Sequence, residues 1–116
     1  MMLRGSSAAS GTQVNLEAIV AGQSVDSLLP GGAALVRFCD AILRHEDDRA
    51  AARQALIAEL GDNAMVDAAG VVGNFQRMVR IADSTGIPVD GRMAAANEQV
   101  REQLGLNDLP SARLII

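Results

Sequence analysis

The sequence predicts an all-α protein, a small helical bundle of about five helices around one long central helix. Apolar residues recur at intervals of three and four in five stretches, and capping or breaking residues bound these stretches. No stretch alternates apolar and polar residues as a half-buried strand would. The chain has 116 residues, which is enough for one domain with a modest core.

The N-terminal part predicts a tail and one short helix. Residues 1–13 are mostly small and polar, so we expect a disordered tail before a single helical domain over residues 14–116. Asn15 suits the N-cap of a short helix that Gly22 ends.

Two helices of similar length are expected next. Pro30 and the glycines after it break the chain, and helical periodicity then runs over residues 33–44 and 48–60. Gly61 ends the second of these helices. The expected inner faces are Leu35, Phe38, Cys39 and Ile42 in the first helix and Ala52, Leu56 and Leu60 in the second, with Arg37, Asp40, Ala41 and Arg44 on the outer face of the first.

The central helix is expected to begin at Asp62, as its cap, and to end at Gly86, shortly before Pro88. Because further apolar residues lie outside its main apolar stripe, we expect neighbours to bury this helix on several sides. The main stripe consists of Met65, Ala68, Ala69, Val72, Phe75, Val79 and Ala82.

The chain ends in one more predicted helix and an apolar tail. Asp90 can cap a helix over residues 91–104, and Gly105 stops it. Residues 114–116 are all apolar, so we expect them to dock against the rest of the protein. The expected inner face of the last helix is Met93, Ala96, Val100 and Leu104.

The composition is apolar and acidic. Hydrophobic residues make up 49% of the chain, charged residues 21%, and the net charge is −4. All basic residues are Arg and aromatic residues are scarce, so we expect no nucleic-acid binding. The sequence has no apolar run of membrane-spanning length and no signal peptide, so we expect a cytoplasmic protein without a membrane partner. Apolar residues beyond the needs of a small core predict a homo-oligomer or another protein partner.

Cys39 and His45 are the only thiol and imidazole groups. They are six residues apart and lie off any common helix face, so we expect no Cys–His nucleophile pair. The acidic run after His45 fits a helix start better than a metal site, because consecutive helical residues point in different directions. We therefore expect no metal and no cofactor, and the catalytic residues, if any, stay unknown.

The second half of the central helix carries the candidate ligand-binding residues. Asn74, Arg77 and Arg80 stand in an otherwise apolar helix. These groups either tie the helix to carbonyls and acids of its neighbours or hold an anionic ligand. In the second interpretation His45 contributes to the same pocket, at a contact between subunits.

Small residues on the same helix predict where two copies meet. Glycine inside a helix costs about 1 kcal/mol relative to Ala, and close approach of another backbone would offset that cost. The predicted oligomer contact consists of Ala69, Gly70, Val72 and Gly73.

The stretch AMVDAAGVVGNFQRMVRIADSTGIPVD, residues 64–90, resembles the C-terminal signature of the carboxymuconolactone decarboxylase and alkylhydroperoxidase-D-like family. The similarity extends over about residues 33–90, and it implies an all-helical protein that forms oligomers, typically trimers or hexamers. Redox members of the family carry Cys-x-x-Cys, a His a few positions later and a nearby Glu. Here Ile42 stands where the second Cys would follow Cys39, and His45 is displaced, so no catalytic residue carries over.

Three functions stay open. The first is a non-redox helical oligomer of unknown biochemical role, similar to alkylhydroperoxidase-D-like scaffolds. The second is an enzyme or small-molecule binder with a pocket at a subunit contact near Arg77 and Arg80. The third is a helical adaptor that binds another protein. Thiol peroxidase activity is not expected, because a dithiol cycle needs a resolving cysteine.

Overall fold

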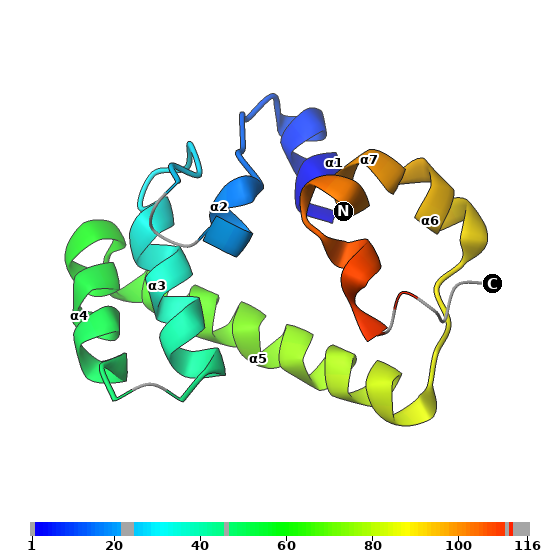
Figure 1. The fold of residues 1–116 in the computed structure, drawn as a ribbon. Helices are drawn as coiled ribbons and strands as arrows, with labels where there is room; N and C mark the ends of the chain where they lie inside the picture. The colour runs from blue at the N-terminus through cyan, green and yellow to red at the C-terminus, as the bar shows by residue number, and fades with distance from the viewer. Residues whose placement is uncertain (1, 22–24, 46, 111, 113–116) are drawn as a thin grey trace.

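The computed structural model describes residues 2–21, 25–45, 47–110 and 112 (Figure 1). This part of the chain is all-α and contains no β-strand, which confirms the predicted fold class. Its α-helices are α1 (Met2–Ser10), α2 (Glu17–Ala21), α3 (Gly32–Leu43), α4 (Arg49–Leu60), α5 (Asp62–Thr85), α6 (Gly91–Ala96) and α7 (Glu98–Gln103), and a short 3-10 helix, η2, spans Leu106–Asp108.

The main core lies where α3 and α4 pack on the first half of α5. Ala34, Phe38 and Leu56 are buried there, and half-buried side chains from the three helices surround them. Ala52 and Leu56 are fully buried, as predicted for α4. Ala41 was expected on the outer face of α3 and is also fully buried, so that expectation is wrong. The covered part of α3 is therefore wider than the apolar stripe that the sequence predicts.

Glycines set both ends of α5. Gly61 stands before the helix with a φ of 88°, and Gly86 follows it in the left-handed conformation with a φ of 63°. The predicted end at Gly86 is confirmed. The predicted cap by Asp62 is wrong, because Asp62 is already the first helical residue and no side chain caps the helix.

The N-terminal residues differ from the expected disordered tail, because Met2–Ser10 form α1. Two adjacent alanines favour the helix, and Gly11 follows it with a φ of 69°. The backbone N–H of Thr12 then donates to the carbonyl of Ser7 at 3.2 Å, which closes the turn.

The last predicted helix is two helices, α6 and α7, with a break at Asn97. Asp90 caps α6 as expected, since its carboxylate accepts from the backbone N–H of Arg92 at 2.8 Å. Because of this break, the residues of α6 and α7 do not share one continuous helix face, and the predicted inner face is confirmed only in part. Val100 is buried and Leu104 half-buried, but Met93 and Ala96 are exposed and Ala94 is buried in their place. The predicted docking of residues 114–116 lies outside the described residues.

The fold is open. Helix α5 joins the α3–α4 lobe at one end to the chain of α6, α7 and η2 at the other, with α1 beside α7 (Figure 1). The radius of gyration is 15.4 Å, against about 13 Å for a compact domain of this length. No residue of α5 is buried, so the expectation that neighbours bury this helix on several sides is wrong for the single chain. Within the described residues, no helix is both long and apolar enough to cross a membrane.

Candidate functional site

The second half of α5 extends beyond the α3–α4 lobe and carries a row of four apolar side chains, three of them exposed and the fourth, Ala82, half-buried. Val71, Phe75, Met78 and Ala82 follow one another at intervals of four, three and four, which places them on one side of the helix. The exposed fractions are 57% for Val71, 44% for Phe75 and 50% for Met78. We call these four residues the open face of α5.

The open face continues a line that is covered earlier in the helix. Stepping back from Val71 by three and then four residues leads to Ala68 and Ala64. Both are half-buried, and Ala68 packs against the core formed with α3 and α4. Helices α3 and α4 therefore cover the first part of one continuous apolar line and leave the rest uncovered.

In the second half of α5 the opposite side is mainly polar. At 100° per residue, Gly73, Arg77 and Arg80 lie roughly opposite Val71 and Phe75 around the helix axis. The second half of α5 is thus amphipathic, and in the described part of the chain Val71, Phe75 and Met78 on its apolar side stay about half exposed. Such a side is the usual signature of a helix that packs against a further element.

The structure brings together two of the predicted ligand-binding residues. A guanidinium nitrogen of Arg77 donates to Oδ1 of Asn74 at 2.9 Å, and both side chains are exposed. Arg80 lies one turn further on, where its carbonyl accepts from the hydroxyl of Ser84 at 2.6 Å. A pair one turn apart on an exposed helix is typical of a solvated surface, and neither Asn74 nor Arg77 lines the pockets beside α2, α4, α6 or α7.

His45 lies apart from this pair. It stands in the turn between α3 and α4 with a left-handed φ of 56° and is exposed. The contacts of this turn tie α3 to α4, since Arg37 donates to a carboxylate oxygen of Asp48 at 3.0 Å. No interaction described here links His45 to Asn74, Arg77 or Arg80. In the part of the chain that the structure describes, no group of three acidic, His or Cys side chains could hold a metal ion.

The four residues of the predicted oligomer contact lie in different environments. A Cβ added at Gly70 or Gly73 would meet no atom within 4 Å, so these glycines face open space. Val72 is half-buried, and Ala69 lines a groove with Phe38, Ile42 and Met65. The glycines lie off the open face, and the contact there stays a prediction. The sequence does contain a pattern that could have indicated the open face, namely the spacing of four, three and four residues between its members.

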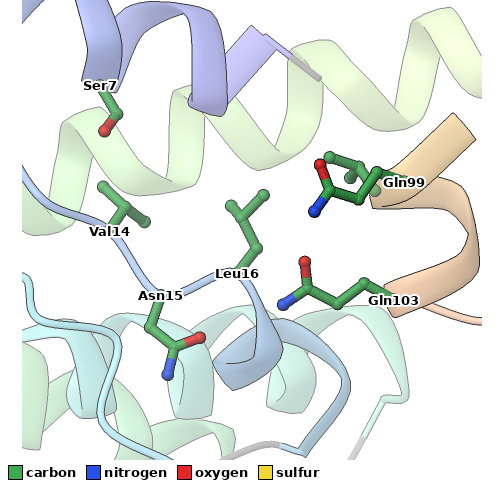
Figure 2. Close-up of a pocket in the computed structure, with 7 residues that line it drawn as sticks. Ser7, Val14, Asn15, Leu16, Gln99 and Gln103 are labelled. Carbon is green, nitrogen blue, oxygen red and sulfur yellow. The ribbon is translucent and has the colours of Figure 1, made fainter. Parts of the chain in front are cut away.

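A hollow of about 240 Å³ lies between the N-terminal segment and α7 (Figure 2). The amide of Gln103 donates to a carboxylate oxygen of Glu17 at 3.0 Å, which joins α7 to α2. The side chain of Asn15 accepts from the backbone N–H of Glu17, the first residue of α2, at 3.0 Å. The hydrogen bonds of Gln103 and Asn15 to Glu17 therefore stabilise the positions of α7 and α2. The lining contains no nucleophile paired with a base. It consists of Ser7, Val14, Asn15, Leu16, Gln99, Val100 and Gln103.

The thiol of Cys39 is half-buried in α3. Burial, and to a smaller extent the negative charge of Asp40, raises the pKa of this thiol above its ordinary value of 9.0. A raised pKa lowers the fraction of reactive thiolate at neutral pH. The site therefore works against nucleophilic chemistry at Cys39.

We expect Cys39 to react with iodoacetamide more slowly than an unstructured cysteine peptide at pH 8, and the rate to rise as the pH is raised past 9. Replacing Asp40 by Asn should speed the reaction at pH 8, because it removes one of the two causes of the shift. Mass spectrometry of the alkylated protein measures the rate, and the urea-unfolded chain is the control. A folded rate equal to that of the peptide at every pH would contradict this expectation.

Comparison with known proteins adds no family assignment. No family model, no curated protein and no solved structure matches this chain.

Proposed function

We propose that this protein is a non-redox helical scaffold that works as a homo-oligomer, with the open face of α5 as its contact surface. The observation that carries the proposal is the uncovered continuation of an apolar line whose first part is already packed in the core. Exposure of Val71, Phe75 and Met78 to water is unfavourable. Burying them against another helix would stabilise the contact by about 25 cal/mol for each Å² of apolar surface removed from water.

The surface area of the single chain supports the same proposal. The accessible surface is 8046 Å², whereas a compact monomer of 12.1 kDa is expected to expose about 6,000 Å². A stable protein–protein contact covers roughly 800 Å² on each partner. The chain as a whole, though not the open face by itself, therefore exposes more surface than such a contact covers.

The resemblance to the alkylhydroperoxidase-D-like family agrees with this proposal in two respects. That family is helical and oligomeric, and its redox chemistry needs a second cysteine that Ile42 replaces here. The proposal keeps the scaffold of that family and leaves out its reaction.

The two alternatives receive less support. A small-molecule site near Arg77 and Arg80 needs a cavity, and both residues stand on an exposed helix side. An adaptor for a different protein would use the same open face, so oligomeric state distinguishes it from a scaffold.

Light scattering of the purified protein at micromolar concentration tests the proposal. We expect a molar mass that is a multiple of 12.1 kDa. A monodisperse monomer would contradict self-association and would favour the adaptor.

A further inference from the structure

We propose that a groove on the α3–α4 lobe binds a small carboxylate that carries an apolar chain, such as a medium-chain fatty acid. The groove lies between α3, α4 and the first half of α5 and has a volume of about 460 Å³. None of the four residues of the open face lines it. Pockets that hold small molecules usually measure about 300–1,000 Å³ and combine an apolar lining with a few polar groups. The proposal does not depend on the oligomeric state, so it can be tested separately from the proposed function.

The apolar part of the groove comes mainly from two helices. Phe38 and Ile42 of α3 are one turn apart, so both side chains lie on one side of that helix. Met65 and Ala69 of α5 have the same spacing. Phe38 is buried, whereas Ile42 and Met65 are half-buried and Ala69 is exposed. An apolar chain laid in the groove would therefore remove apolar surface of both helices from water, which is favourable.

The cationic part of the groove comes from the first half of α4. Arg49 and Arg53 are one turn apart, and both line the groove. Neither forms an ion pair among the described residues, whereas Arg37, Arg44 and Arg92 each have a nitrogen 3.0 to 3.8 Å from a carboxylate oxygen. The planar set of N–H donors on arginine fits a carboxylate well. Two unpaired guanidinium groups beside an apolar lining are therefore complementary to an anion with an apolar body.

One acidic residue, Asp47, also lines the groove. With two arginines and one aspartate, the lining has a net charge of +1, whereas the whole chain has a net charge of −4. The groove therefore favours an anion where the chain as a whole does not. Because the Asp47 carboxylate repels an anion, its removal should strengthen the binding of a carboxylate and weaken the binding of an amine.

Titration of the wild-type protein with octanoate, followed by two-dimensional NMR spectra of the isotope-labelled protein, tests the proposal. Below the concentration at which octanoate forms micelles, we expect saturable shifts that are largest at the backbone amides of residues 38–42, 47–53 and 65–69. Octylamine has the same chain with a positive head group and should bind at least about threefold more weakly. Acetate has the head group without the chain and should not reach saturation.

Variants of the charged residues test the part that the arginines play. The double variant Arg49→Gln and Arg53→Gln should bind octanoate at least about threefold more weakly, since each exposed charge contributes only modestly. Asp47→Asn should bind it more tightly than the wild type. Arg80→Gln is the matched control, because Arg80 is an exposed arginine of α5 that does not line the groove. Its affinity should be unchanged, and circular dichroism checks that all variants keep their helices.

Four results would overturn the proposal. The first is the absence of saturable octanoate binding, and the second is equal affinity for octanoate and octylamine, which would mean that charge plays no part. The third is an affinity that the double arginine variant leaves unchanged. The fourth is a set of shifts centred on residues 71–82, which would place the ligand on the second half of α5. The first, second and fourth results come from the wild-type protein and do not depend on the folding of any variant.

Discussion

Replacing Phe75 by Asp is expected to make the protein monomeric. Phe75 is 44% exposed in the single chain and is the largest side chain of the proposed contact surface. Loss of a central aromatic anchor costs at least about 2 kcal/mol, roughly 30-fold in Kd, and an unpaired carboxylate buried in an apolar seam costs more. Light scattering over a dilution series measures the shift.

Val66→Asp is the matched control for this prediction. Val66 is also an exposed apolar residue of α5, but it lies on the opposite side of the helix, so the same change of side chain should leave association intact. Circular dichroism checks that both variants keep their helices. If Val66→Asp dissociates the protein and Phe75→Asp does not, the open face is not the contact.

Gly73→Leu separates the open face from the glycine contact predicted from the sequence. A side chain at Gly73 meets no atom of its own chain. If another backbone approaches this glycine closely, Leu should weaken association. If the open face is the contact, the mass should be unchanged, because Gly73 lies on the other side of the helix.

Helix ends were the most predictable part of this fold. Gly61 and Gly86 both have positive φ values, and each stands at a boundary of α5 that the sequence indicates. A glycine at such a boundary is a local requirement, since other residues rarely adopt that backbone conformation. Asp90 acts in the same local way through its bonds to the next backbone amides. Local rules of this kind need no knowledge of the tertiary fold.

Burial was less predictable because it depends on which element lies beside which. Helix α4 has 12 residues and α5 has 24, so α4 can run beside only about half of α5. The apolar line of α5 is continuous in the sequence, and nothing local indicates that its cover stops near Ala68. Ala41 is a second example, because its complete burial depends on the tertiary neighbours of α3, which the sequence does not indicate.

The candidate site shows the same difference between local features, which the sequence predicts, and tertiary features, which it does not. The spacing of Asn74 and Arg77 predicts that they are neighbours, and a hydrogen bond of 2.9 Å joins them. Whether His45 could join them depends on the position of the α3–α4 turn, which only the tertiary structure shows. The spacing of the residues on the open face can be seen in the sequence. That these residues stay exposed depends on the position of the α3–α4 lobe, which the sequence does not show.

Replacing Leu56 by Ala is expected to destabilise the protein by about 2–5 kcal/mol. Leu56 is fully buried between α3, α4 and α5, and the other buried residues of the described core cluster are Ala34 and Phe38. A core with so few large side chains cannot rearrange to fill the space that the missing atoms leave, so most of the cavity cost remains. Urea unfolding followed by circular dichroism measures the change in the free energy of unfolding.

Leu43→Ala is the control, because it makes the same change at a position near the end of α3 where the side chain is 43% exposed. We expect this variant to lose less than about 1 kcal/mol. Both variants must be compared with the wild type at one protein concentration, since association adds to the apparent stability of the folded chain. Equal losses from the two variants would mean that Leu56 does not anchor the packing of α3 and α4 on α5. In the proposed oligomer this anchor would matter for the contact as well, because the α3–α4 lobe covers only the first part of α5 and leaves Val71, Phe75 and Met78 exposed.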